Sequence, residues 1–126
     1  MEKFMSKKAK IILVAIVGAL GQSFNALSGH SLSDVLSAHM LQIFKTGAKY
    51  HLIYSVVLLI FALMDKKEYD LPFYLFFTGI VLFSVSLYLF AFVGKSFIIW
   101  FTPIGGIFFI AGWLSLIYVA IKNNKE

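Results

Sequence analysis

The sequence contains no cysteine, which excludes disulfide bonds, CxxC redox chemistry and thiolate metal sites. Charge is also scarce, because 13% of the 126 residues are charged, about half of the share found in an ordinary soluble domain. No Asp or Glu falls inside the long apolar runs, so a paired-acid site or a carboxylate proton relay cannot form there. The chain also has no nucleotide-binding motif and no haem-attachment motif. We therefore expect no catalytic residues, no cofactor and no enzymatic activity.

Apolar sequence, by contrast, is abundant: 60% of the residues are hydrophobic and 17% are aromatic. So short a soluble domain could not bury that much apolar surface, whereas a helix needs about 20 apolar residues to cross a hydrocarbon core of about 30 Å. We predict an all-α integral membrane protein with a single domain over residues 1–126. Four transmembrane helices are expected in one bundle at about 9–28, 46–64, 71–92 and 97–121, and Pro72 suits the first turn of the third.

Residues 31–45 differ in kind from these spans. Ser31 and Asp34 have the spacing of a capping box, and the apolar residues that follow recur at helical spacing opposite a polar side. The segment is too short and too polar to cross a membrane. We predict a short amphipathic helix between the first two spans, lying in the plane of the membrane interface; a short helix that caps the bundle from outside is the alternative.

Two of the spans allow a second interpretation. The first has the basic start and short apolar core of a cleaved signal peptide. Against this, small and polar residues share one helical face and would let another helix approach closely: Ala15, Gly18, Gln22, Asn25 and Gly29. The last span has two possible starts. In the first, Thr102 is the N-cap, Pro103 is the first helical residue and 97–101 form an interfacial or re-entrant approach. In the second, one Pro-kinked helix runs from Phe97.

The formal net charge of +5 comes from lysines that gather between the apolar runs. Most of them precede the first run, lie in the break between the second and third, or close the chain: Lys3, Lys7, Lys8, Lys10, Lys66, Lys67, Lys122 and Lys125. This distribution is the positive-inside pattern of a membrane protein and argues against a nucleic-acid partner. We predict a multi-pass protein of the cytoplasmic membrane with both termini in the cytoplasm.

Several motifs together resemble a family of small four-helix bacterial inner-membrane proteins of unknown function. They are Phe-Ser-x-Ser-Leu-Tyr at 83–88, Thr-Pro-x-Gly-Gly at 102–106 and Gly-Trp at 112–113. Upstream, residues 27–30 resemble the family's Phe-Gly-Ala-His element and residues 44–50 its Phe-Glu-Thr-Ala-x-Arg-Tyr element. Where the family has Gln and His in Tyr-Gln-x-x-His, this chain has His51 and Tyr54. The resemblance covers nearly the whole chain and implies the fold and the location, but no activity.

With the N-terminus inside, most polar groups of the spans fall toward the outer end of the bundle. An unpartnered polar group in hydrocarbon is costly, so these groups either line an outward-opening pocket for a small polar or anionic headgroup or bond to one another and hold the helices together. The candidate residues are Gln22, Asn25, His30, His51, Tyr54, Ser84, Ser86, Tyr88, Thr102, Gly105 and Gly106. The histidines at 30, 39 and 51 stand on separate segments, so we expect no metal site.

Two functions are consistent with these patterns. The first is a structural, interaction or assembly protein of the cytoplasmic membrane that pairs with copies of itself or with a larger partner. Its small-residue faces would be Ala15 with Gly18 and Gly105 with Gly112. The alternative is a binder or transporter of a small solute or a lipid that uses the polar pocket. A transport pathway would then need a homo-oligomer, because four helices without an intramembrane charge do not make a monomeric pore.

Overall fold

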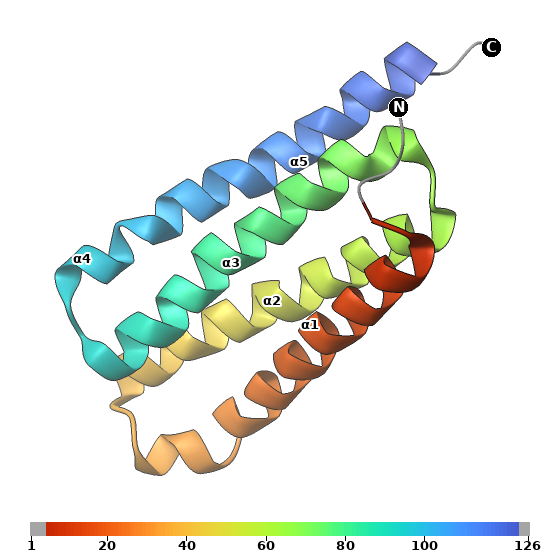
Figure 1. Ribbon diagram of the computed structural model, residues 1–126. Coiled ribbons are helices and arrows are strands. Elements are labelled where there is room, and N and C mark those ends of the chain that lie inside the picture. Colours follow the sequence, from red (N-terminus) through yellow and green to blue (C-terminus); the bar gives the residue numbers. More distant parts are fainter. Residues whose placement is uncertain (1–4, 124–126) are drawn as a thin grey trace.

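The computed structural model of the chain describes residues 5–123, all of whose regular elements are helices (Figure 1). Lys3 and Lys125, two of the lysines behind the topology prediction, lie outside the described residues. The elements in order are α1 (Lys7–Ser28), the 3-10 helix η1 (Ser31–Asp34), α2 (Ala38–Met64), the 3-10 helix η2 (Lys67–Tyr69), α3 (Asp70–Val93), α4 (Ser96–Ile99) and α5 (Phe101–Asn123).

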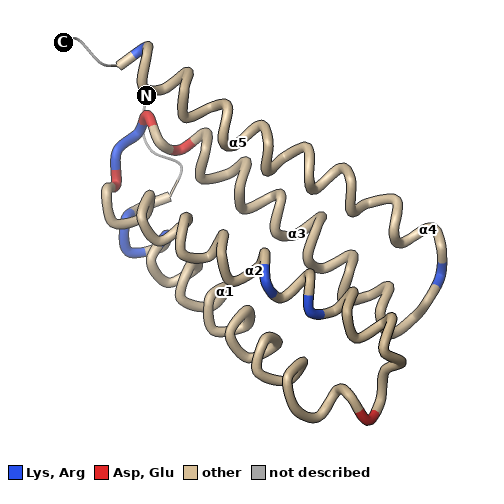
Figure 2. Tube along the Cα trace, turned by 180° about the vertical axis from the view of Figure 1, so that it is seen from behind, with Lys and Arg blue, Asp and Glu red and all other residues tan. Residues whose placement is uncertain are grey.

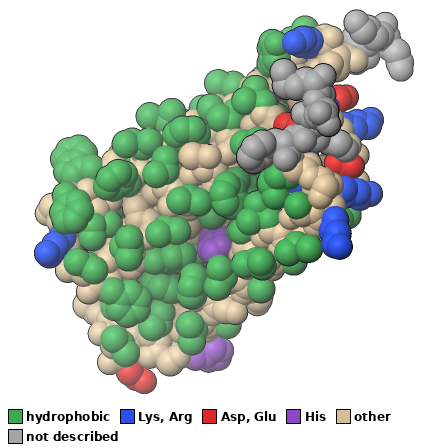
Figure 3. Space-filling view, viewed as in Figure 1, with side chains coloured by type: hydrophobic (Ala, Val, Ile, Leu, Met, Phe, Trp, Pro, Cys, Tyr) green, Lys and Arg blue, Asp and Glu red, His purple; other side chains and the backbone are tan. Residues whose placement is uncertain are grey.

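Four stretches are helical, long and apolar enough to cross a membrane: Lys7–Ser28, Ala38–Met64, Lys67–Val93 and Ser96–Asn123. Each contains one of the four predicted spans, so the all-α membrane fold is confirmed. Large apolar side chains cover the face of the molecule seen in Figure 3, while lysine and acidic side chains appear mainly at its ends. A soluble protein would bury such side chains; here they meet lipid.

Helices that follow one another in the sequence also lie side by side. The main packed pairs are α1 with α2, α2 with α3, and α3 with α5 (Figure 1). The start of α1, the turn between α2 and α3, and the end of α5 share one end of the molecule. The central pair, α2 and α3, therefore forms the core, and α1 and α5 occupy the two outer positions.

The segment 31–45 is not the single amphipathic helix that the sequence predicts. Ser31–Asp34 form only the short η1, whose N-terminus has no side-chain cap, so the predicted capping box does not form. Instead the Ser37 hydroxyl accepts a hydrogen bond from the Met40 amide, at 3.2 Å, and starts α2 at Ala38. The second spanning helix thus begins at Ala38 rather than at residue 46, because the better cap lies inside the predicted interfacial helix.

Both interpretations of the last apolar run also need correction. Ser96–Ile99 form the short α4, and α5 begins at Phe101 after a break at Trp100, so neither one kinked helix from Phe97 nor a start at Pro103 is found. Pro103 lies in the first turn of α5, where its missing N–H has no helical acceptor to lose. Thr102 does not cap the helix; its hydroxyl bonds to the Ser86 hydroxyl of α3 at 2.6 Å.

The buried face of α1 differs from the face of small and polar residues predicted for it. The buried residues of α1 are Lys10, Val14, Gly21 and Ser28, whereas Ala15, Gln22, Asn25 and Gly29 are exposed. Gly21 is the point of closest approach to α2, because a Cβ there would stand 3.0 Å from the His51 ring. α1 therefore packs as a member of the bundle, although through a neighbouring face.

Glycine and phenylalanine interlock α3 and α5. Gly79 of α3 faces the Phe109 ring of α5, and Gly112 of α5 faces the Phe76 ring of α3, so each helix inserts a ring where the other has no side chain. Gly105 meets backbone and not a ring, because a Cβ there would clash with the Phe83 backbone nitrogen of α3. Close glycine packing of this kind replaces the hydrophobic effect as the force that joins helices in lipid.

The adjacent glycines of α5 give a matched test of this packing. Gly105→Ala should destabilise the protein by about 1–3 kcal/mol, because the added methyl meets backbone that cannot move aside. Gly106→Ala meets nothing within 4 Å and should be neutral or stabilise the helix by up to about 1 kcal/mol. Unfolding in mixed micelles of increasing dodecyl sulfate fraction measures both; equal effects of the two substitutions would contradict the interface.

Candidate functional site

A buried histidine joins three helices near the middle of the bundle. His51 of α2 is 5% exposed, and its Nε2 lies 2.8 Å from the Val17 carbonyl of α1. Its Nδ1 lies 2.9 Å from the Tyr88 hydroxyl of α3. Because a carbonyl can only accept, Nε2 is assigned the proton and Nδ1 accepts from the tyrosine O–H. The neutral imidazole therefore has both nitrogens engaged within the protein.

Glycines and aromatic rings let the helices approach closely around His51. Gly21 admits the imidazole against α1, and Gly47 admits the Tyr88 ring, which would lie 3.1 Å from a Cβ at that position. The rings of Phe24 and Phe44 pack against Tyr88 with centroids 4.9 and 4.7 Å away. This aromatic cover keeps the histidine in a low-dielectric environment, where its hydrogen bonds are strongest and an unmade one would be most costly.

Further polar side chains of α2, α3 and α5 are also paired across helix boundaries. Ser84 of α3 donates to the Gly47 carbonyl of α2 at 2.8 Å. The buried Tyr54 hydroxyl of α2 accepts from the Trp113 indole N–H of α5 at 2.8 Å. The Tyr54 ring also stacks on Phe109 with centroids 3.9 Å apart. The candidate residues Ser84 and Tyr54 thus each bond a neighbouring helix.

The structure brings together only part of the candidate set. His51 and Tyr88 bond directly, with Ser84 close by through Gly47, while Ser86 with Thr102 and Tyr54 with Trp113 form separate pairs. Gly105 is filled by Phe83 and Gly106 faces open space. On α1 and the turn after it, the predicted pocket residues are exposed and do not reach the interior: Gln22, Asn25 and His30. The polar pocket stays a prediction, and the bonds found are those of the helix-joining alternative.

The cavities lined by described residues lie mostly outside this group. An apolar groove of about 300 Å³ runs between α1 and α2, with Ala15, Gly18, Ala19 and Ser55 among its lining residues. A second one, of about 220 Å³, lies between α3 and the α4–α5 segment and touches the candidate set only at Ser86. Neither groove is lined by a titratable side chain, so neither offers a group for acid or base chemistry.

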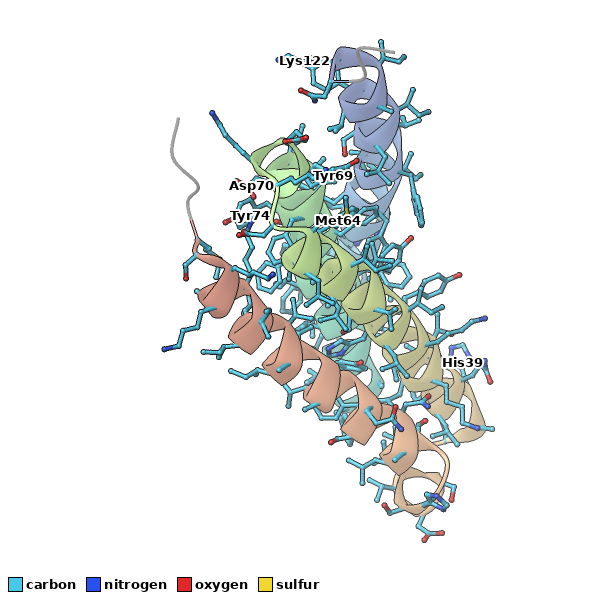
Figure 4. The ribbon with its side chains drawn as sticks, turned by 90° about the vertical axis from the view of Figure 1, so that its right-hand side faces the viewer. His39, Met64, Tyr69, Asp70, Tyr74 and Lys122 are labelled. Atoms are coloured by element: carbon cyan, nitrogen blue, oxygen red, sulfur yellow. The ribbon has the colours of Figure 1, made fainter. Side chains whose placement is uncertain are left out.

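Metal binding finds no support among residues 5–123, where no three His, Cys, Asp or Glu side chains gather closely enough to hold an ion. His30 and His39 are exposed, and His51 already has both nitrogens bonded. Figure 4 shows His39 far from Asp70, toward the opposite end of the bundle.

An ion pair between α1 and α3 is the contact that sequence reasoning missed. Lys10, only 2% exposed, bonds with its Nζ to the Asp70 carboxylate and lies 5.4 Å from the centre of the Phe73 ring. Figure 4 shows Asp70 at the start of α3, beside Tyr69 and Tyr74. Nothing local signals this pair, because its members are 60 positions apart and each is attributed from sequence to a different solvated segment. It fixes the position of α1, which has few other charged contacts.

Removing one member of the ion pair should lower the stability of the protein. Asp70→Asn leaves the buried Lys10 ammonium without a counter-charge and should lower the free energy of unfolding by roughly 3 kcal/mol. The double variant Lys10→Met with Asp70→Leu should recover most of the loss, since no charge is then stranded. Unfolding in mixed micelles measures both, with Lys7→Gln, an exposed lysine of the same helix, as control. A double variant less stable than Asp70→Asn would contradict the ion pair.

The hydrogen bonds of His51 with Val17 and Tyr88, which we call the histidine network, allow a similarly matched pair of substitutions. Tyr88→Phe removes the donor to His51 Nδ1 in a buried site and should destabilise the protein by about 1–3 kcal/mol. Tyr118→Phe removes a hydroxyl that contacts only an exposed Lys122 and should change stability little. The same unfolding assay compares them, and an unchanged stability of Tyr88→Phe would mean that the hydrogen bond does not form.

Comparison with known proteins agrees with this architecture. A family profile described as "Protein of unknown function (DUF423)" matches residues 24–106. The chain is 38% identical over 122 residues to the UPF0382 membrane protein of Haemophilus influenzae, covering 94% of this chain and 98% of the relative. It is 33% identical over 120 residues to the UPF0382 membrane protein YwdK of Bacillus subtilis, covering 91% and 98%.

The name of a third relative specifies the inner membrane. The UPF0382 inner membrane protein YgdD of Escherichia coli is 30% identical over 126 residues, covering 97% of this chain and 96% of the relative. No solved structure matches the chain. The similarity runs over nearly the full length of each relative, and the resemblance argued from the motifs is thereby confirmed: this chain belongs to the DUF423 family, whose curated relatives are UPF0382 membrane proteins.

Proposed function

We propose that this protein acts by assembly within the cytoplasmic membrane and not by catalysis, with a second copy of itself as the first partner. The observation that carries the proposal is the groove between α1 and α2. Its lining combines small residues, Ala15, Gly18 and Ala19, with no charged side chain, so another helix can approach to backbone contact there.

The share of each span that is buried also favours the α1 side of the molecule as the side that pairs with a partner. Only 17% of the apolar window of α1 is buried, against 44% in α2 and α3 and 28% in the last span. The polar groups of the interior are meanwhile bonded to one another and offer no reactive group to a substrate. An α-helix that packs on one side only, and presents small residues in a groove beside that side, is suited to pairing.

The other predicted face takes no part in this proposal. Gly105 and Gly112 are filled by Phe83 and Phe76 of the same chain, so they join α5 to α3 and are closed to a partner. Substituting them would disrupt the fold before it disrupted an assembly. Ala15 and Ala19, which are exposed, are therefore the positions at which assembly can be tested without loss of the fold.

The proposal includes an orientation with both termini in the cytoplasm. Five exposed lysines lie at the end of the bundle that carries the start of α1 and the end of α5: Lys7, Lys8, Lys66, Lys67 and Lys122 (Figure 2). Of the other described lysines, Lys95 lies in the turn between α3 and α4 at the other end, and Lys45 and Lys49 lie within the first half of α2. The larger group belongs on the cytoplasmic side by the positive-inside rule.

A cysteine-free chain makes the orientation and the assembly testable with single cysteines. In spheroplasts, Ser6→Cys and Asn123→Cys should resist a membrane-impermeant maleimide until the membrane is opened, whereas Ser31→Cys should react at once. In native membranes, Ala19→Cys should form a disulfide-linked dimer and Ile107→Cys, on the exposed face of α5, should not. Adding Ala15→Leu should abolish the dimer by filling the groove. Equal cross-linking at positions 19 and 107 would contradict the proposed interface.

A further inference from the structure

A hollow corner lies at the end of the bundle where η2 meets the last turn of α5. One cavity of about 320 Å³ is lined there by Lys67, Glu68, Leu71, Tyr118 and Lys122 among others. A neighbouring cavity of about 300 Å³ adds Lys66 and Tyr69 and shares Glu68, Val119 and Asn123 with the first. Figure 4 shows Lys122 at the end of α5, beyond Tyr69. Because the two cavities share three lining residues, we treat them as one corner, which neither the histidine network nor the α1–α2 groove includes.

The charges of this corner favour an anion. Its lining residues include three lysines, Lys66, Lys67 and Lys122, and one acid, Glu68, which leaves a net charge of about +2. The Asp70 carboxylate, two positions after Glu68, is already paired with Lys10 of α1. Lys122 also lies in the last turn of α5, where a cation offsets the partial negative charge of the helix end.

Hydrogen-bond donors converge on the same space. The Lys122 ammonium donates to the Tyr118 hydroxyl at 3.1 Å and lies 5.4 Å from the centre of that ring. This contact uses one of the three ammonium hydrogens and leaves the hydroxyl's own hydrogen free to donate outward. A lysine held in this way, in a cavity that Lys67 also lines, can bind the oxygens of a phosphate.

The corner also continues into an apolar surface. Leu71 is 51% exposed and Ile117 is 57% exposed, and further exposed apolar side chains of α5 follow toward the middle of the span. A ligand with a charged head and apolar tails matches both parts, whereas a free phosphate or an acidic soluble protein would use only the lysines. The position of the corner at the end of four membrane-spanning helices places it at headgroup depth.

We propose that this corner binds the phosphate headgroup of an anionic phospholipid, with Lys67 and Lys122 as the main phosphate ligands and the acyl chains along α5. Such a site localises the generic attraction of lysines for anionic leaflets to one place on the protein. It is independent of the proposed assembly, because the α1–α2 groove lies elsewhere and contributes no residue.

The test titrates purified protein in neutral detergent with dioctanoyl phosphatidylglycerol and compares dioctanoyl phosphatidylcholine. The double variant Lys67→Gln with Lys122→Gln should bind the anionic lipid about tenfold or more weakly. The control, Lys45→Gln with Lys95→Gln, removes two exposed lysines of equal charge from the opposite end and should bind as the wild type does. If both double variants lose affinity equally, the attraction is diffuse and the site does not exist.

Two further measurements complete the test. Glycerol 3-phosphate, the headgroup without tails, should compete at least tenfold less well than the lipid; equal competition would overturn the lipid assignment in favour of a free anion. Glu68→Gln removes the one acid of the corner and should strengthen phosphatidylglycerol binding severalfold. Because this substitution takes away no lysine, it tests the proposal even if the lysine variant fails to fold, and unchanged or weaker binding would overturn the proposal.

Discussion

The absence of water in the hydrocarbon core is the constraint on which the rest of this structure depends. Every polar group placed there must find a partner inside the protein. His51 meets this requirement on both ring nitrogens, Ser84 bonds a carbonyl of α2, and Tyr54 accepts from Trp113. Each of these bonds crosses a helix boundary. These buried polar residues therefore help to specify which helices pair and in which register.

Close packing supplies what the hydrophobic effect cannot supply in lipid. Where α3 meets α5, glycines of each helix receive phenylalanine rings of the other, and Gly105 approaches the backbone at Phe83. The Tyr54 ring extends this stack toward α2 through Phe109. The central helices α2 and α3 are thereby held to α5 on one side, while on the other side α1 packs on α2, where Gly21 meets His51, and is joined to α3 by the Lys10–Asp70 ion pair.

The two proposed binding surfaces follow from this packing. The interior is occupied by the protein's own aromatic and polar side chains, so both proposals concern the surface. The groove between α1 and α2 is apolar and small residues are part of its lining, which suits a helix of another chain. The corner between η2 and α5 is basic and borders apolar surface, which suits a lipid headgroup. The two surfaces differ in chemistry and belong to different helices, so their functions are separable.

The sequence alone determined that lipid surrounds the chain, how many spans there are and where the lysines lie between them. Hydropathy and span length are properties of consecutive residues, so they do not depend on contacts between helices. It also singled out polar residues such as His51, Tyr54 and Tyr88, and left open whether they line a pocket or bond to other residues of the bundle. Only the tertiary structure decided which side of each helix is buried. Gln22 and Asn25 are exposed, and Gly105 is filled while Gly106 is open, because the rotation of a helix about its axis depends on the surface of its neighbour. For the same reason the pairing of Lys10 with Asp70 has no local signal: an ion pair between distant helices exists only once the fold has brought its members together.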